Sequence, residues 1–587
     1  MLDTHIVNIR NEVDNWLLSF NEAISDKISK TDSIENLNKL FFENSHWRDI
    51  LALTWQIQTT SGKQNIIPKL YDKVLNVIAK DFVIDPQRTQ PREVIRAGKN
   101  VVEVILKFKT KFGYCEGVVR LYEDSEASGT FKAWNFLTAL SDLNSSFNKK
   151  EDQYENTLEG PNWLDVRKED RLYKDRDPEV LVVGSGQAGL SIAARLKQQN
   201  IDTLVVDKNE RVGDNWRNRY HSLKLHNQTH VNHLPYMPFP PTWPTYIPKD
   251  KLAGWFEYYA ESMELNVWTK TTFISAEYDK AEKNWNVKLK LSDGNERIMK
   301  PKHIVMAVGV SSVPNRTKIP GMEGYKGKVI HSTDYSNGRD YKGKNVLVFG
   351  TGTSAHDVAQ DLYVHGAKVK IVQRSPSMVV NVEPSAQLPY QLYREGPNTD
   401  DCDLITISSP LTVLKKTHQL LTEKTKEIDR PLLDKLEEVG FRLEYGEENT
   451  GWQFKYLTRG GGYYFNVGAS DLIAERKIKI IQFSDIINFN PSGIEMKSGD
   501  NFDIDLMVTA TGYKGQEYVV EEFFGKAVVE KVGPIWGFDN DRQELRNMWM
   551  QTNQPGLWFH AGSLAQCRIF SKFLALQIRA IQDGIVI

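Results

Sequence analysis

The chain has few cysteines, and their positions exclude several classes of protein. Only three occur among 587 residues, at Cys115, Cys402 and Cys567. Cysteines this far apart exclude a disulfide scaffold, a cysteine-rich metal site and a CxxC redox centre. Sparse, unpaired cysteines are typical of a reducing compartment, so we expect a cytoplasmic protein.

Long apolar runs are also missing. No stretch approaches the roughly 18–20 uninterrupted apolar residues of a membrane-spanning helix, so no transmembrane segment is expected. The first residues lack a basic segment followed by an apolar one, and we expect no secretory signal. The last residues are apolar but interrupted by Arg579, Gln582 and Asp583. This pattern predicts a docked amphipathic helix rather than a membrane anchor.

Neither sign of charge is in excess. Lys and Arg number 74 and Asp and Glu number 76, which gives a net charge of −2. Balanced charge removes the usual electrostatic reason to expect a nucleic-acid partner. Hydrophobic residues make up 40% of the chain and charged residues 26%, a globular composition with room for about four domain-sized units.

Residues 1–155 have the pattern of an α+β unit. Ile9, Val13, Trp16 and Leu17 fall on one helical face, and a second helix is predicted over 40–53. Alternation near 102–109 and the runs after it predict strands, so we expect a helix-packed, curved antiparallel sheet. A charged stretch follows, and we interpret 156–178 as a linker. Linkers of this kind usually separate independent cores, so the unit is expected to fold without the rest.

A glycine-rich turn follows the linker. The sequence runs strand, turn, helix, strand, with Gly184, Gly186 and Gly189 in G-x-G-x-x-G spacing and Asp207 ending the second strand. The first glycine permits the tight turn, the second lets a pyrophosphate approach, and the third lets the helix pack on the strand. An acid at this distance can accept hydrogen bonds from a ribose. The segment therefore predicts a dinucleotide site.

A second turn of the same kind begins at Gly350. Gly350, Gly352 and Ala355 form a G-x-G-x-x-A variant, and Arg374 ends the following strand. An arginine at that position accommodates a 2′-phosphate, which favours NADP over NAD, although an ordinary strand-end cation is the alternative. Two dinucleotide sites on one chain indicate a flavoprotein oxidoreductase in which hydride passes from a nicotinamide to a flavin.

Residues 175–585 resemble the flavin-containing monooxygenases. KNERVGDNWRNRY is similar to the family's G-G-x-W flavin segment, with Asp214 replacing the second glycine. YKGKVIHSTDY is similar to the fingerprint F-x-G-x-x-x-H-x-x-x-[FY], with Tyr325 replacing the opening phenylalanine and His331 in the histidine position. VTATGYKG near the C-terminus resembles the family's F-A-T-G-Y segment.

Locally the chain also resembles the plant YUCCA-type indole-3-pyruvate monooxygenases. The stretch LKLHNQTHVNHLPYMPFPPTWPTYIPKDKL carries that likeness. In many family members an asparagine beside the flavin hydrogen-bonds the oxygenated cofactor. His226 occupies that place here and Asn227 is adjacent, so either residue is a candidate. The amino-terminal unit resembles a SnoaL-type cone, through LFFENSHWRDILALTWQIQTTSGK and the later strands.

The resemblance implies an α/β fold with two Rossmann-like domains, for FAD and NADPH, preceded by an α+β SnoaL-like cone. The expected order is cone 1–155, linker 156–178, FAD domain 179–340, NADPH domain with a helical insertion 341–500, and FAD domain again 501–587. The candidate catalytic residues are His226, Asn227 and His331. The candidate FAD-binding residues are Gly184, Gly186, Gln187, Ala188, Gly189, Asp207, Lys208, Gly213 and Trp216, and those for NADPH are Gly350, Gly352, Thr353, Ser354 and Arg374.

The implied reaction is that of an NADPH-dependent flavin monooxygenase. NADPH reduces FAD, O2 adds to give a 4a-hydroperoxyflavin, and one oxygen atom passes to a small organic substrate. Oxygenation at nitrogen or sulfur is favoured, and oxidative decarboxylation of an indole-3-pyruvate-like α-keto acid is the alternative. Baeyer–Villiger oxygenation is a further one, although those enzymes typically place tryptophan where Tyr335 stands. No metal is expected, because the histidines between 221 and 233 lie in a segment that resembles flavin-flanking loops. A homodimer is left open.

Overall fold

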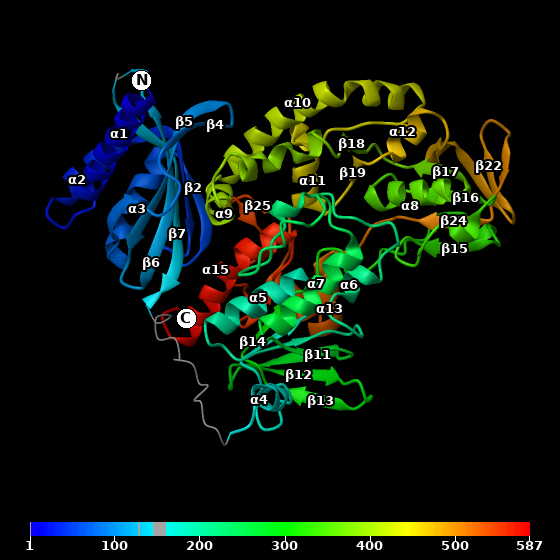
Figure 1. The fold of residues 1–587 in the computed structure, drawn as a ribbon, viewed down its shortest axis with the longest axis horizontal. Helices are drawn as coiled ribbons and strands as arrows, with labels where there is room; N and C mark the ends of the chain where they lie inside the picture. Colours follow the sequence, from blue (N-terminus) through cyan, green and yellow to red (C-terminus); the bar gives the residue numbers. More distant parts are fainter. Residues whose placement is uncertain (1, 127–128, 145–159, 587) are drawn as a thin grey trace.

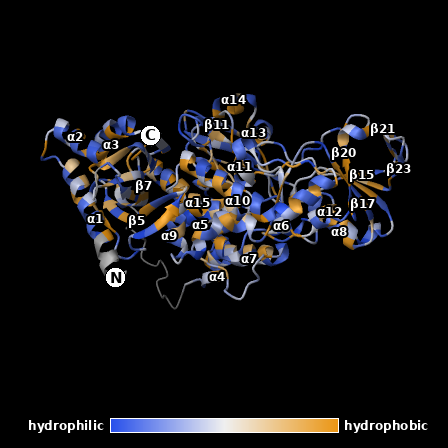
Figure 2. Cartoon of the chain, turned by 90° about the horizontal axis from the view of Figure 1, so that it is seen from above, coloured by the Kyte–Doolittle hydropathy of each residue, from blue (hydrophilic) through white to orange (hydrophobic). Residues whose placement is uncertain are grey.

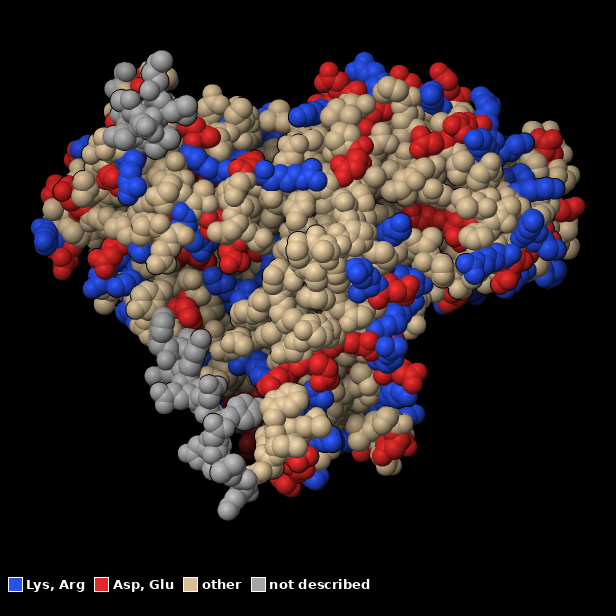
Figure 3. Space-filling model, in the orientation of Figure 1, with Lys and Arg blue, Asp and Glu red and all other residues tan. Residues whose placement is uncertain are grey.

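The computed structural model describes residues 2–126, 129–144 and 160–586, with the side chains from Ile9 onward. Figure 1 shows an amino-terminal unit beside two further units, each built on its own parallel sheet. Positive and negative side chains are interspersed over the face drawn in Figure 3, in keeping with the balanced composition. No helix of the described part of the chain combines the length and apolarity needed to cross a membrane.

The amino-terminal unit is a seven-stranded sheet covered by helices. Its main strand order is β2-β1-β7-β6-β5-β3, and β4 pairs with β5. All pairs are antiparallel except β1 with β7. The elements are α1 (Leu2–Ala23), α2 (Lys30–Leu40), β1 (Phe41–Ile50), β2 (Ile57–Ser61), α3 (Lys63–Val77), β3 (Lys80–Ile84), β4 (Arg92–Arg96), β5 (Lys99–Lys109), β6 (Gly113–Glu123) and β7 (Phe131–Leu143).

The first predicted helix is confirmed in this unit, but the helix predicted over 40–53 is wrong. Trp16 and Phe20 of α1 lie on one helical face and pack edge-on against Phe136 of β7. Helix α2 ends at Leu40, and the next ten residues form β1 between β2 and β7. The mixed apolar and charged spacing of that stretch fits either period, and one of its two strand partners, β7, lies far away in sequence. The likeness to a SnoaL-type cone stays a prediction.

The first Rossmann-like unit has an all-parallel sheet of order β10-β9-β8-β14-β27. Strands β8, β9, β14 and β27 are buried along their whole length, as expected for a parallel sheet covered on both faces. Its elements are β8 (Val180–Val183), α5 (Gln187–Gln198), β9 (Thr203–Val206), α6 (Asp214–Arg217), α7 (Lys249–Ser262), β10 (Asn266–Trp268), β14 (His303–Met306), β27 (Leu557–Phe559) and α15 (Leu564–Gln582), with an antiparallel sheet of β11 (Thr272–Asp279), β12 (Asn284–Lys290) and β13 (Glu296–Met299).

The second Rossmann-like unit has a parallel sheet of order β15-β24-β16-β17-β20. Figure 2 shows hydrophobic residues on its strands. Its elements are β15 (Lys328–His331), β16 (Asn345–Phe349), α8 (Thr353–Val364), β17 (Lys368–Gln373), α12 (Ala469–Ala474), β20 (Lys479–Gln482) and β24 (Leu506–Thr509), with a small sheet of β21 (Ile486–Asn490), β22 (Gly493–Met496) and β23 (Asn501–Asp503). The two parallel sheets confirm the predicted fold class.

The expected boundaries at 341 and 501 do not coincide with the second sheet. Strand β15 lies before the first boundary and β24 after the second, yet both pair within this sheet. The difference arises because strand pairing is non-local, whereas the boundaries were drawn from local motifs. The predicted linker also differs: residues 156–159 lie outside the described residues, and Trp163–Asp170 form helix α4.

The insertion between β17 and α12 runs alongside both Rossmann-like units (Figure 1). Its longest element is one helix of 28 residues, α10, which contains Pro431. The insertion contains β18 (Met378–Asn381), the 3-10 helix η5 (Ser385–Arg394), α9 (Thr399–Ile407), α10 (Leu411–Glu438), α11 (Gly451–Arg459) and β19 (Tyr463–Asn466), and the C-terminal part adds α13 (Gln516–Phe524), α14 (Lys526–Val532), β25 (Phe538–Asp539) and β26 (Glu544–Leu545).

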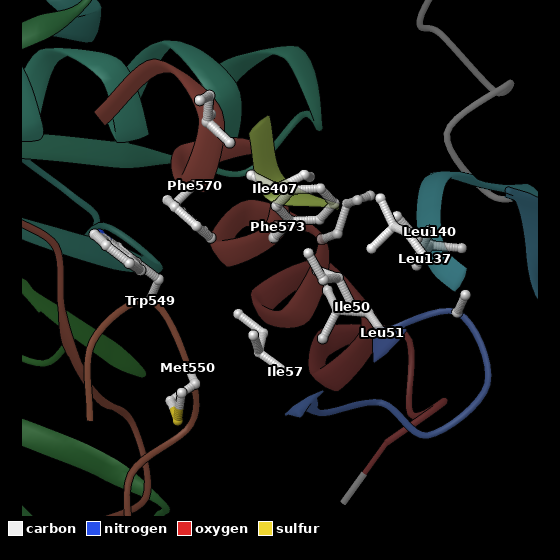
Figure 4. Packing of buried hydrophobic residues seen from close by; sticks show 14 of the residues in the cluster. Ile50, Leu51, Ile57, Leu137, Leu140, Ile407, Trp549, Met550, Phe570 and Phe573 are labelled. Carbon is white, nitrogen blue, oxygen red and sulfur yellow. The ribbon is translucent and has the colours of Figure 1, made fainter. Parts of the chain in front are cut away.

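The amino-terminal unit shares a hydrophobic core with the C-terminal helix. Figure 4 shows Phe573 of α15 on the side of Ile50, Leu137 and Leu140 of the sheet, whereas Phe570 lies beside Trp549. These side chains belong to one buried cluster that continues into the first Rossmann-like unit. The expectation of an independently folding unit therefore does not agree with the packing, because separation would expose this core to water.

Replacing Phe573 by alanine should destabilise the whole chain. Phe573 is 2% exposed, and truncating a buried phenylalanine costs about 3–5 kcal/mol. Because the core is shared, the amino-terminal sheet and the Rossmann-like units should lose structure in one transition, at a lower temperature than in the wild type. Thermal unfolding followed by circular dichroism measures this.

A matched control is Ile95→Ala, on an amino-terminal side chain that is 67% exposed. This change should alter stability by no more than about 0.5 kcal/mol. Two well-separated transitions in the wild-type protein would contradict the shared core.

Candidate active site

The first glycine turn combines two crowded positions with one open position. Gly184 has φ +107°, and a Cβ on it would lie 2.7 Å from the carbonyl oxygen of Ala307. A Cβ on Gly189 would lie 1.8 Å from the oxygen of Gly184. At Gly186, by contrast, a Cβ would meet only the side-chain amide of Asn215, at 3.0 Å. The turn is therefore closed towards the protein and open at Gly186, which starts α5, as a pyrophosphate cradle requires.

Asp207 orders this turn as well as lining the cavity beside it. Its Oδ2 accepts hydrogen bonds from the backbone N and the hydroxyl of Ser185, both at 2.7 Å, and Oδ1 accepts one from the N of Asn209 at 2.8 Å. Lys208 is exposed and also lines the cavity. A carboxylate has about four acceptor positions, so Asp207 retains capacity for a ribose hydroxyl.

The segment around Trp216 closes the far side of the same turn. Gly213 has φ +89°, and a Cβ there would lie 2.4 Å from the oxygen of Ala253. Asp214, which replaces the family's second glycine, forms an ion pair with Arg217 at 2.8 Å. The indole N–H of Trp216 donates to Oε1 of Gln187 at 3.3 Å. The departure at Asp214 is thus accommodated by a local ion pair, and Trp216 and Gln187 both line the cavity.

The second turn repeats the arrangement of the first. Gly350 has φ +114°, and a Cβ on it would lie 2.6 Å from the oxygen of Ala510. At Gly352 the nearest atom to a Cβ would be the oxygen of Tyr463, 3.9 Å away. Thr353 and Ser354 begin the twelve-residue helix α8 and line the cavity. This turn is also open where a pyrophosphate would lie.

Arg374 lies at the carboxyl end of β17, exposed to solvent and outside the cavity lining. Arg442, also exposed, donates from Nη2 to the carbonyl oxygen of Arg374 at 2.7 Å. Two guanidinium groups thus stand at the strand end where the 2′-phosphate is predicted. Arg442 was missed from the sequence because it lies 68 residues further along the chain.

One cavity of about 1490 Å³ joins both turns. Of the sequence-predicted residues it brings together Gly184, Gly186, Gln187, Ala188, Asp207, Lys208, Trp216, His226, Asn227, Gly352, Thr353 and Ser354. Gly189, Gly213, Gly350, His331 and Arg374 do not line it. The three glycines act through backbone packing behind the wall. In the described residues no group of three or more His, Cys, Asp or Glu side chains is placed to hold a metal ion.

His226 and Asn227 face the cavity next to each other but have different partners. The ring of His226 lies edge-on to Phe465 with centroids 5.6 Å apart, and its backbone oxygen accepts from Gln387 at 2.9 Å. Burial lowers the pKa of His226, against a smaller opposing effect of the Asp357 charge. The side-chain amide of Asn227 donates to the hydroxyl of Tyr390 at 3.1 Å. His226 is therefore uncharged at neutral pH, and its neighbour is held by Tyr390.

His331 is buried behind the cavity wall, at the end of β15. It is 2% exposed, and Nδ1 is 2.9 Å from the hydroxyl of Thr333 and accepts from the Thr333 backbone N at 3.2 Å. Burial lowers the pKa of His331, and the Arg316 charge lowers it further. The residues that follow it, Ser332 to Asp334, do line the cavity. His331 thus shapes the turn that carries them.

Aromatic side chains from the insertion and the C-terminal part cover a large part of the cavity. Trp452 packs edge-on to Phe465 at 4.7 Å, and Tyr463 lies 5.1 Å from Phe465. Trp549 and Phe570 stack with centroids 3.8 Å apart. We call the aromatic wall the set Tyr390, Tyr393, Trp452, Tyr456, Tyr463, Phe465, Phe538, Trp549 and Phe570. No sequence motif pointed to this wall, because its members come from segments far apart in the chain.

The amino-terminal unit also reaches this cavity, through Arg48 of β1. Arg48 donates to both carboxylate oxygens of Glu544, from Nε at 2.8 Å and from Nη2 at 2.6 Å. Both residues are almost fully buried and both line the cavity. No sequence motif pointed to either of them.

Comparisons with known proteins agree with this geometry. The family described as "Pyridine nucleotide-disulphide oxidoreductase" matches residues 181–394. The chain is similar to a probable indole-3-pyruvate monooxygenase, YUCCA7, of Arabidopsis thaliana, with 31% identity over 60% of this chain and 78% of that protein. It is also similar to indole-3-pyruvate monooxygenase YUCCA1 of Oryza sativa subsp. japonica, with 30% identity over 57% of this chain and 77% of that protein.

Among solved structures, cyclohexanone-bound cyclohexanone monooxygenase in its Rotated conformation has the same fold. The TM-score is 0.51 and the identity 15%, over 70% of this chain and 88% of that one. Three observations point to the same family. They are the two parallel sheets, the two glycine turns open to one cavity, and the likeness to monooxygenases over most of their length. The chain belongs to the flavin-dependent monooxygenase family, whose members use FAD and NADPH.

Proposed function

We propose that this enzyme transfers one oxygen atom of O2 to a nitrogen or sulfur atom of a small apolar substrate. The composition of the aromatic wall and its surroundings carries the proposal. Among the cavity-lining residues of 389–465 and 538–570, only Glu544 is charged, and Arg48 neutralises it. Aromatic faces can bury a neutral amine or thioether, whose lone pair accepts the oxygen atom, whereas a carboxylate would meet no unpaired cation there.

FAD would lie along the first glycine turn, and NADPH along the second. The FAD pyrophosphate would lie against the first glycine turn, formed by Gly184, Gly186, Gln187, Ala188 and Gly189. The ribose would bind at Asp207 and Lys208. The segment with Gly213 and Trp216 would contact FAD beside this turn. Gly350, Gly352, Thr353 and Ser354 would hold the NADPH pyrophosphate, and Arg374 its 2′-phosphate. When bound, FAD accepts hydride from NADPH and supplies the activated oxygen.

The protein's own groups would orient the reactants and exclude water. We assign the hydrogen-bond donor beside the flavin to His226 rather than to Asn227, because the bond to Tyr390 orients the Asn227 amide and occupies one of its two N–H donors. His331 would act as a positioning residue through the turn from Ser332 to Asp334. The aromatic wall would keep water away from the reacting atoms, which protects the activated oxygen from loss as hydrogen peroxide.

A second candidate reaction is oxidative decarboxylation of an indole-3-pyruvate-like acid. The YUCCA relatives favour it, and Arg219, which lines the cavity and acts electrostatically on Asp357 near His226, is a cation that could meet the carboxylate. Steady-state NADPH oxidation with thioethers, tertiary amines, aryl-pyruvates and cyclic ketones, with product identification, separates the reactions. Turnover of aryl-pyruvates alone would select decarboxylation, and lactone formation would select Baeyer–Villiger chemistry.

We also propose a cytoplasmic location and a homodimer. All three cysteines are free and buried, as suits a reducing compartment. Fractionation of the source cells and the mass from light scattering test these two points.

Replacing Gly186 by valine should give a colourless protein. The position has ordinary β-region dihedrals, φ −78° and ψ −172°, so valine fits the backbone and its side chain projects where the pyrophosphate would lie. The visible flavin spectrum of the purified variant measures the loss. Gly254→Val, at a helical glycine with no atom within 4 Å of an added Cβ, should remain yellow. A full flavin spectrum in the Gly186 variant would contradict the assignment.

Arg374→Ala should weaken NADPH binding roughly 10- to 150-fold, the value of one charge-assisted hydrogen bond, and leave NADH nearly unchanged. Arg442→Ala should act in the same direction, because its guanidinium group stands beside Arg374. Arg339→Ala is the control, since this exposed residue lies before β16, at the opposite end of the strands. The KM values for NADPH and NADH measure the effect. Equal losses for both cofactors would reject the 2′-phosphate role.

His226→Leu should release more hydrogen peroxide per NADPH oxidised, because it removes a donor from the cavity. Asn227→Leu should do so less. Burial lowers the pKa of His226 from its ordinary value of 6.5, so the neutral ring persists as the pH falls through that value. Coupling in the wild type should therefore hold from pH 8 to pH 6.5 and decline only below it. Peroxide yield across this range is the measurement, and a loss of coupling centred on pH 6.5 or above would contradict a neutral donor.

A further inference from the structure

A wall of the catalytic cavity is built where the amino-terminal unit meets the rest of the chain. We call it the junction wall, formed by Arg48, Thr406, Ile407, Ser409, Leu411, Gln543 and Glu544. Every one of these residues lies outside the stretch 181–394 that the family match covers. The matched family region therefore does not supply the junction wall.

Arg48 is rigid rather than free to bind a ligand. Its backbone lies in β1, paired on one side with Thr59 of β2 and on the other with Leu137 of β7. Nε and Nη2 donate to Glu544, and Nη1 donates to the carbonyl oxygen of Ile407 at 2.6 Å. Glu544 also accepts from the hydroxyl of Thr59 at 3.2 Å. The pair therefore acts as a fixed, electrically neutral surface.

The same unit holds the chain between α9 and α10 in place. Asn135 donates to the oxygen of Ser408 at 2.6 Å, and Arg120 donates to the hydroxyl of Ser409 at 3.1 Å and to the oxygen of Ile405 at 3.3 Å. These contacts, with Arg48 on Ile407, fix the segment from which Thr406, Ile407 and Ser409 face the cavity. The amino-terminal unit thus sets the position of the whole junction wall.

We propose that the amino-terminal unit determines substrate specificity, with the Arg48–Glu544 pair limiting how far an apolar substrate can extend towards that unit. The proposal rests on oxygenation at nitrogen or sulfur within this cavity. Besides these polar groups, the cavity lining includes the apolar side chains of Leu411, Leu414, Leu545 and Ile569. Such a surface fits an uncharged aliphatic or aromatic end of the substrate. The long Arg48 side chain occupies space that a longer substrate would need.

The test compares alkyl phenyl sulfides from methyl to octyl in the wild type and in Arg48→Ala/Glu544→Gln. The second change removes the charge that the first would leave buried and unpaired. The variant should favour longer chains: kcat/KM for the longest sulfide should rise roughly tenfold relative to methyl phenyl sulfide, the effect of burying about two more methylene groups. The rate of flavin reduction by NADPH should not change.

Lys572→Ala/Glu116→Gln is the matched control. That ion pair, 2.5 Å between Nζ and Oε1, joins α15 to β6 at the same junction, but neither residue lines the cavity. If weaker docking of the amino-terminal unit were the cause, both double variants would show the changed chain-length preference. If the Arg48–Glu544 pair limits the substrate, only Arg48→Ala/Glu544→Gln should show it. Leu411→Trp, which leaves the Arg48–Glu544 pair intact, should shift the preference to shorter chains and serves if the first variant does not fold.

Equilibrium binding separates this inference from the proposed function. The dissociation constant of each sulfide, measured from the change in the flavin absorption spectrum without NADPH, should show the same shift in chain length. A shift in binding with no sulfoxide formed would support the wall and reject sulfur oxygenation. An identical chain-length profile in the wild type, Arg48→Ala/Glu544→Gln and Leu411→Trp, or an equal shift in the control, would overturn the inference.

Discussion

Helix α15 is buried on two sides, and the arrangement of the molecule depends on it. Leu564, Cys567, Leu574 and Ile578 pack into the core of the first Rossmann-like unit. Residues on another face, including Phe570 and Phe573, belong to the core shared with the amino-terminal sheet (Figure 4). A helix buried on only one face could accept a docked domain loosely. Here helix α15, nineteen residues long, packs into both cores, so side-chain packing fixes their relative position.

The start of this helix belongs to the cavity. A capping box between Ser563 and Gln566 fixes its first turn, and Gly562, Ser563, Ile569 and Phe570 line the cavity. The helix that joins the cores therefore also forms part of the catalytic chamber. Any displacement of the amino-terminal unit that moves α15 would change the shape of the aromatic wall.

The parts of the fold and site that the sequence predicted are those governed by local backbone geometry. Gly184 and Gly350 have positive φ and no room for a Cβ, so the strand–turn–helix units were recognisable from a few consecutive residues. The helix predicted over 40–53 and the domain boundaries at 341 and 501 depended on strand partners far away in sequence, and there the structure differs. The same reason hid Arg48 and Arg442, because each acquires its role from a segment 68 or more residues away.

The buried charged side chains at the junction position the neighbouring segments more than they stabilise the fold. A buried ion pair contributes little net free energy, because desolvation offsets the attraction, but it is strongly directional. Arg48 and Arg120 direct their guanidinium groups at the carbonyl oxygens of Ile407 and Ile405, at the C-terminal end of α9. The oxygen of Ile405 also accepts from the backbone N and the hydroxyl of Ser408. The helix dipole makes the carbonyl oxygens of the last turn favourable sites for cations. These directional contacts fix the end of α9 in addition to the apolar packing of the shared core. It follows that the amino-terminal unit is a structural part of the cavity. Local backbone geometry shapes the two glycine turns, whereas contacts between distant segments position the junction wall.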